Sequence, residues 1–161
     1  MSDLERVSQD VVRAYTAKGM TLGAAESLTG GMIAAAVAGV PGASAVLAGG
    51  VVSYMPRVKH QVLAVEQSVI DTVGVVSEAC ALEMAQGARA LLRVDVAVSA
   101  TGVAGPTGGT AETPVGTVWL GVSGPKGAVA KRCRLTGDRQ SIREQSAVAA
   151  LKLALDAITE E

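Results

Sequence analysis

The chain has 161 residues, of which 49% are hydrophobic and 18% charged, with a formal net charge of -1 at pH 7. That length suits one domain over 1–161, and a near-neutral charge with two Tyr, one Trp and no Phe disfavours nucleic-acid binding. Glycines break the apolar runs well short of the ~20 residues of a membrane-spanning helix. The polar, acidic N-terminus lacks the features of a secretory signal, so we expect a cytoplasmic protein that engages neither nucleic acid nor membrane.

The cysteine and histidine contents limit metal and redox chemistry. Cys80 and Cys133 form no CxxC pair, and in a cytosolic protein they are expected as buried free thiols rather than as a disulfide. His60 is the only histidine. A histidine-based zinc site needs several His or Cys ligands, so no metal site is expected.

The N-terminal half alternates helical and strand patterns. In chain order we expect a helix over 3–19, a strand over 20–25, a small-residue helix over 29–38, a strand over 45–54 and two short helical pieces within 56–73. Gly19 ends the first helix, and Gly39 with Pro41 ends the second.

The C-terminal half carries the clearest helix, over 77–92, with Ser77 as N-cap. The elements that follow are an apolar strand over 94–100, a glycine-rich loop over 102–113, two β-branched strands over 115–123 and 128–135, and an amphipathic helix from Asp138 to about 158. The turn at 124–127, Gly-Pro-Lys-Gly, predicts a hairpin between the two β-branched strands.

This order predicts an α/β protein: a three-layer α/β/α sandwich with a mainly parallel sheet and an antiparallel hairpin near 115–135. A core of Val, Leu, Ile and Ala suits such flat layers. Ligands in these folds bind at the carboxyl ends of the strands. Three segments leave strands at that edge: 26–31, 54–59 and 101–110.

The first of these segments, 25–31, places Ser27 at a strand-to-helix turn before Gly30 and Gly31. Free N–H groups at a helix start, with glycines that allow close approach, could form an oxyanion site beside a serine nucleophile. The alternative is that Ser27 or Thr29 simply caps the helix.

A serine nucleophile needs a base. His60 is the only imidazole, and a neutral lysine is the alternative if burial lowers its pKa. Of the five lysines, Lys59 alone follows a strand exit that also presents a tyrosine, Tyr54. A solvated lysine and a surface histidine remain the alternatives for these two positions.

The loop 101–110, TGVAGPTGGT, follows the most apolar strand. It matches neither GxxxxGK[ST] nor GxGxxG, so neither ATP hydrolysis nor dinucleotide binding follows. Backbone N–H groups near Gly102 and Gly105 could cradle a phosphate, or the loop could be a long structural turn. Arg139 lies in the first turn of the last helix, where the dipole disfavours a cation. It is therefore either a ligand for a substrate phosphate or an exposed side chain.

Six motifs in this order resemble the CinA C-terminal domain family, which includes stand-alone nicotinamide-nucleotide amidases. They are AESLTGG at 25–31, VPG at 40–42, Tyr54 with Lys59, TGVAGP at 101–106, PVGTVW at 114–119 and GDR at 137–139. The resemblance extends from about residue 4 to 158.

The resemblance implies a bacterial amidase that hydrolyses nicotinamide mononucleotide to nicotinate mononucleotide and ammonia, without metal or organic cofactor. It implies Ser27 as nucleophile and Lys59 as base, supported through hydrogen bonds by Tyr54 and Thr101. The expected substrate contacts are Ser44, Gly102, Gly105 and Arg139, with N–H groups around Thr29, Gly30 and Gly31 as the oxyanion site.

Two positions depart from the family pattern. Leu28 stands where many relatives have cysteine, and Pro56 falls in a run that usually contains asparagine, where it removes a backbone donor. A non-catalytic nucleotide-binding module and an amidase for another carboxamide nucleotide or nucleoside are the alternative functions. An Ala- and Val-rich surface is compatible with a homo-oligomer.

Overall fold

The computed structural model describes residues 1–159. Its helices are α1 (Asp3–Lys18), α2 (Met32–Ala38), α3 (Pro56–Leu63), α4 (Gln67–Asp71), α5 (Glu78–Leu92) and α6 (Arg139–Asp156), with a short 3-10 helix η1 (Ala43–Ala45). The strands are β1 (Leu22–Glu26), β2 (Leu47–Val52), β3 (Val96–Gly102), β4 (Thr117–Gly124) and β5 (Gly127–Arg134). The predicted order of elements is confirmed, and η1 is the one addition.

The five strands form one sheet in the order β2-β1-β3-β4-β5. Both β2 and β3 run parallel to β1, whereas β4 runs antiparallel to β3 and to β5. The predicted hairpin is thus confirmed, and the sheet as a whole is mixed. A strand parallel to β3 would need a long crossover, and the 103–116 loop contains no helix that could make one.

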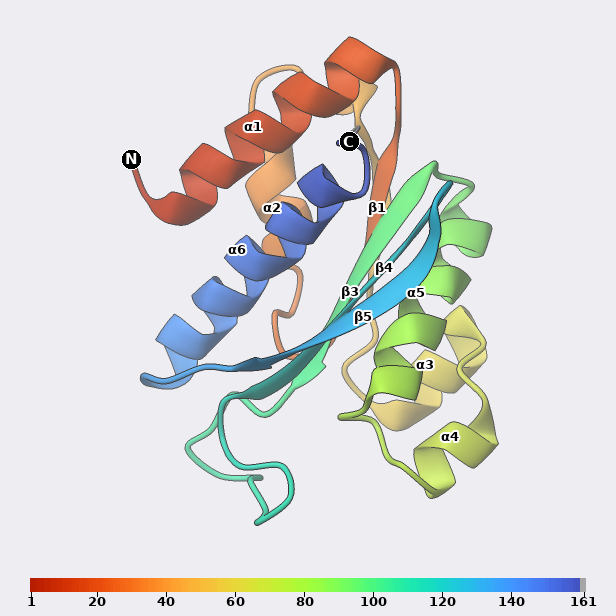
Figure 1. Ribbon diagram of the computed structural model, residues 1–161, viewed down its shortest axis with the longest axis vertical. Coiled ribbons are helices and arrows are strands. Elements are labelled where there is room, and N and C mark those ends of the chain that lie inside the picture. Colours follow the sequence, from red (N-terminus) through yellow and green to blue (C-terminus); the bar gives the residue numbers. More distant parts are fainter. Residues whose placement is uncertain (160–161) are drawn as a thin grey trace.

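Helices cover both faces of the sheet, which confirms the three-layer sandwich (Figure 1). One face is covered by α1, α2 and α6, which also pack against one another. On the other face α5 packs directly on the strands, with α3 and α4 beside it.

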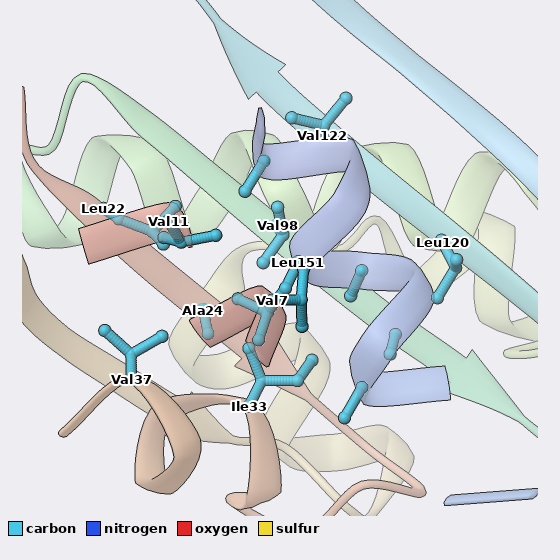
Figure 2. Close-up of a cluster of buried hydrophobic side chains, with 14 of the residues drawn as sticks. Val7, Val11, Leu22, Ala24, Ile33, Val37, Val98, Leu120, Val122 and Leu151 are labelled. Carbon is cyan, nitrogen blue, oxygen red and sulfur yellow. The ribbon is translucent and has the colours of Figure 1, made fainter. Parts of the chain in front are cut away.

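The larger hydrophobic core lies between the sheet and the layer of α1, α2 and α6. Its buried members include Val11 from α1, Ile33 from α2, Val98 from β3 and Leu151 from α6 (Figure 2). With no Phe in the chain, aliphatic side chains fill this space. The buried Tyr15 hydroxyl donates to the Ala154 carbonyl at 2.6 Å and so links α1 to α6.

Small residues let α5 approach the sheet and α3 closely. The Ser99 hydroxyl donates to the Ala81 carbonyl of α5 at 2.6 Å. A Cβ at Gly121 would overlap that same carbonyl. A Cβ at Gly87, in the middle of α5, would overlap the Leu63 carbonyl at the end of α3. The position of α3 therefore depends on glycine at position 87.

Both cysteines are free, as expected; Cys80 is buried and Cys133 is half-buried. None of the helices within residues 1–159 has the length and apolar character needed to cross a membrane.

Candidate active site

The carboxyl ends of three parallel strands bring Ser27 to one edge of the sheet. Glu26, the last residue of β1, pairs with Val52 on one side and Ala100 on the other. The hydrogen bonds continue one residue further, since the Ser27 N–H donates to the Ala100 carbonyl at 2.9 Å and the Ser53 N–H to the Glu26 carbonyl at 2.8 Å. The backbone of Ser27 is therefore fixed between the ends of its neighbouring strands.

The side chain of Lys59 meets that of Ser27. Its Nζ lies 3.0 Å from the Ser27 Oγ across 32 positions of sequence. Pro56 is the first residue of α3, where a helix needs no backbone donor, so this departure from the family pattern leaves α3 intact. The His60 ring is exposed, and its Nδ1 lies 2.8 Å from the Val65 carbonyl. Lys59 rather than His60 is thus the basic side chain at the serine.

The amine of Lys59 is buried, and no residue among 1–159 forms an ion pair with it. The side chain is 1% exposed and also donates to the carbonyls of Ser53 at 2.7 Å and Tyr54 at 3.2 Å. Burial lowers the pKa of Lys59, while the nearby Cys80 has a smaller effect in the opposite direction. Lysine at this position therefore favours its neutral form more than a surface lysine does.

Glu26 occupies the start of α2. Its two carboxylate oxygens accept hydrogen bonds from the N–H groups of Ile33 at 2.8 Å and Ala34 at 3.0 Å. The N-cap residue is Gly31, with φ 106°, which has no side chain of its own, so the Glu26 carboxylate caps the helix in its place. The interpretation of Ser27 as a helix cap is therefore wrong, and its hydroxyl is left to Lys59.

The same arrangement moves the candidate oxyanion donors from the helix to the turn before it. Within that turn the Gly30 N–H donates to the Ser27 carbonyl at 3.0 Å. The N–H groups of Leu28, Thr29 and Gly31 have no acceptor within the described part of the chain. They are the groups beside the serine that remain available to a developing negative charge.

Arg139 lies at the rim of this edge, and it is not a free surface arginine. Its Nη1 donates to the Gly105 carbonyl at 2.7 Å and its Nη2 to the Tyr54 hydroxyl at 2.9 Å. Asp138 caps α6 as predicted, accepting from the Ser141 N–H at 2.8 Å. The glycine-rich loop has no basic residue of its own, and α6 supplies one.

Three of the expected site residues have other surroundings. The Thr101 hydroxyl donates to the Val75 carbonyl at 2.8 Å rather than to Ser27 or Lys59. Gly102 lies within β3, where a Cβ would come within 2.6 Å of the Thr117 carbonyl, so strand packing already requires glycine there. Ser44 lies in η1, before β2 begins, and thus at the opposite edge of the sheet from Ser27.

Sequence reasoning missed two residues that hold the serine turn in place, Glu26 and Arg143. Arg143 donates from Nε to the Leu28 carbonyl at 2.8 Å and from Nη2 to the Thr29 carbonyl at 3.2 Å. It lies four residues after Arg139, and that helical spacing would have placed both on one face of α6. No comparable signal marks Glu26. No cluster of His, Cys, Asp and Glu suited to a metal ion occurs in residues 1–159.

Comparisons with known proteins show which family the chain belongs to. A family model described as the CinA C-terminal domain matches residues 4–158. A nicotinamide-nucleotide amidohydrolase PncC from Enterobacter agglomerans is 44% identical over 94% of this chain and 93% of its own. A CinA-like protein from Geotalea uraniireducens is 45% identical over 88% of this chain, which spans only 34% of that longer relative.

Solved structures give the same result. A competence/damage-inducible protein from Agrobacterium tumefaciens superposes with a TM-score of 0.96 at 35% identity, covering 99% of this chain and 98% of its own. A CinA superfamily protein from Klebsiella pneumoniae gives a TM-score of 0.91 at 35% identity, covering 95% of this chain and 96% of its own. This chain belongs to the CinA C-terminal domain family.

Proposed function

We propose that the protein is an amidohydrolase that converts nicotinamide mononucleotide and water into nicotinate mononucleotide and ammonia, with Ser27 as nucleophile and Lys59 as its base. The observation that carries the proposal is the 3.0 Å contact between the Lys59 Nζ and the Ser27 Oγ, at a buried amine that has no carboxylate partner among residues 1–159. The substrate is suggested by the name of the Enterobacter agglomerans relative, which matches nearly the full length of both chains.

The three hydrogen-bond partners of Lys59 can be satisfied by either protonation state of the amine. An ammonium group has three N–H donors, whereas a neutral amine has two donors and one lone pair. The carbonyls of Ser53 and Tyr54 accept two hydrogen bonds. An ammonium donates to the Ser27 Oγ in the third direction, whereas in the neutral amine the lone pair faces that oxygen and can accept the proton of the serine hydroxyl.

The reaction follows from this pairing. The Ser27 Oγ attacks the carboxamide carbon while Lys59 takes the hydroxyl proton. The tetrahedral intermediate collapses, the C–N bond breaks, and Lys59 returns the proton to the departing ammonia. Water then attacks the acyl-serine ester and gives a proton to Lys59, which passes it to the Ser27 oxygen as the nicotinate carboxyl group is released.

Two further groups complete the site. The Leu28 N–H belongs to the residue after the nucleophile and has no acceptor among residues 1–159, which makes it an oxyanion donor in this mechanism. Arg139 holds the substrate phosphate at the rim, with the Tyr54 hydroxyl and the glycine-rich loop beside it.

The test is ammonia release from nicotinamide mononucleotide, compared with nicotinamide riboside and nicotinamide. We expect release from the mononucleotide and none above background from Ser27→Ala, whose circular dichroism stays that of the wild type. Ser68→Ala, an exposed serine on α4, is the matched control and keeps the wild-type rate. Binding of the mononucleotide without ammonia release would indicate a nucleotide-binding module, and faster release from the riboside would indicate a different amide substrate.

A further inference from the structure

The guanidinium of Arg143 forms two hydrogen bonds to the turn that follows Ser27. Two of its nitrogens donate to consecutive carbonyls, those of Leu28 at 2.8 Å and Thr29 at 3.2 Å. The third nitrogen, Nη1, donates to the Gln140 side chain at 3.0 Å. The planar guanidinium is therefore held on α6 and fixes two peptide groups 115 and 114 positions away.

The Leu28–Thr29 peptide transmits this contact to the serine turn. In a trans peptide the carbonyl and the following N–H point in opposite directions. A guanidinium on the Leu28 carbonyl therefore directs the Thr29 N–H away from Arg143, and this N–H has no acceptor within residues 1–159. A charge-assisted hydrogen bond to the carbonyl also polarises the peptide and strengthens its N–H as a donor.

We propose that Arg143 is a positioning residue that orients and polarises the Leu28–Thr29 peptide, so that the Thr29 N–H joins the Leu28 N–H in stabilising the oxyanion. The proposal rests on the amidase function proposed above. It assigns Arg143 a different task from Arg139, whose side chain is exposed at the rim.

The local backbone supports this role. Gly30, the next residue of the turn, has φ 58°, and a Cβ there would lie 3.4 Å from the Arg143 Nη2. Glycine thus permits the left-handed backbone of the turn, and the guanidinium lies directly beside it. Lysine could not replace Arg143 in this contact, because an ammonium is a point charge on a flexible side chain and cannot hold two carbonyls in one plane as the planar guanidinium does.

The experiment measures kcat and KM for nicotinamide mononucleotide in Arg143→Met and Arg143→Lys. Removal of one oxyanion donor commonly costs about 10²- to 10³-fold in kcat, so we expect roughly 10²-fold for Arg143→Met, with KM within about threefold. Arg143→Lys falls between the wild type and Arg143→Met. The pH dependence set by Lys59 stays unchanged in both variants, because the Ser27–Lys59 contact is intact. Lys152→Met, which removes an exposed cation from the same helix, keeps the wild-type kcat and KM.

The outcomes separate this inference from the function on which it rests. A wild-type protein that releases no ammonia contradicts the proposed function itself. An active wild type with an unchanged kcat in folded Arg143→Met overturns the inference alone. A raised KM at constant kcat also overturns it, since Arg143 would then bind substrate directly. If Arg143→Met is unfolded by circular dichroism, the same two criteria apply to Arg143→Lys.

Discussion

The Tyr54 hydroxyl accepts a hydrogen bond from the Arg139 Nη2 at 2.9 Å, although 85 positions separate the two residues. This contact joins the segment after β2 to the first turn of α6. The other end of the guanidinium holds the Gly105 carbonyl, so that one side chain bridges two loops at the rim of the site. The Arg139 guanidinium is thereby oriented in advance, which in the proposed mechanism lowers the entropic cost of binding the substrate phosphate.

Replacing Arg139 by glutamine should weaken substrate binding more than it slows the chemistry. A charge-assisted contact is worth roughly 1.5–3 kcal/mol, and 1.4 kcal/mol is tenfold in affinity, so we expect KM for nicotinamide mononucleotide to rise about tenfold or more. Steady-state kinetics measure this, with Arg132→Gln on β5 as a control that leaves KM unchanged. A lower kcat at constant KM would place Arg139 in the chemical step instead.

In the proposed mechanism, the pH dependence of the rate reports the protonation of Lys59. The base must be neutral, and burial lowers the pKa of Lys59 from its ordinary value of 10.5. We therefore expect log(kcat/KM) to fall on the acid side with a slope approaching one. The measurement is kcat/KM from pH 5 to 8, with circular dichroism at each pH to verify folding. A flat profile over this range would argue against a lysine base.

The lowered pKa of Lys59 should also make the stability of the protein depend on pH. Unfolded Lys59 keeps its proton up to about pH 10.5, whereas the folded form releases it at lower pH. Between those two values the unfolded state binds more protons, so this residue makes the free energy of unfolding increase as pH rises. The Tm of the wild type relative to Lys59→Met should accordingly increase from pH 7 to pH 10. A constant Tm difference would mean that burial does not perturb this amine.

Glu26→Gln should destabilise the protein. An amide oxygen can accept from only one of the two N–H groups of Ile33 and Ala34, and its NH2 group faces the other. Hydrogen bonds to charged groups contribute about 1.5–3 kcal/mol, so we expect a loss of about 2 kcal/mol in the free energy of unfolding. Urea denaturation measures it. Glu144→Gln, an exposed residue on α6, should change stability by less than about 0.5 kcal/mol.

The parts of the fold that depend on local chemistry were predictable. Gly19 ends α1 in a left-handed conformation, Ser77 and Asp138 cap their helices, and the Gly-Pro-Lys-Gly turn makes the hairpin. Each of these signals acts within a few residues of the feature it specifies. The mixed character of the sheet was less evident. The direction of β4 depends on the absence of a crossover helix from the 103–116 loop, and no single residue signals that absence.

The candidate site was predictable only in part, for a similar physical reason. Ser27 and Lys59 could be placed at one end of the sheet because both follow parallel strands, whose ends must meet, and the family resemblance singled them out as nucleophile and base. Glu26 was missed because its carboxylate turns back onto α2, a contact that no periodicity marks. Arg143 was missed because its acceptors are backbone carbonyls 115 and 114 positions away, which any sequence provides.

The lack of a side chain at Gly87 affects α3 as well as α5, to which Gly87 belongs. Lys59 lies one turn before Leu63 on α3, and the Leu63 carbonyl rests where a Cβ at Gly87 would be. A methyl group added at position 87 would push α3 away from α5 and increase the distance between the Lys59 Nζ and the Ser27 Oγ. The distance between α3 and α5 therefore sets the distance between Lys59 and Ser27. Gly87→Ala would lower the rate of turnover although residue 87 contacts neither reacting group.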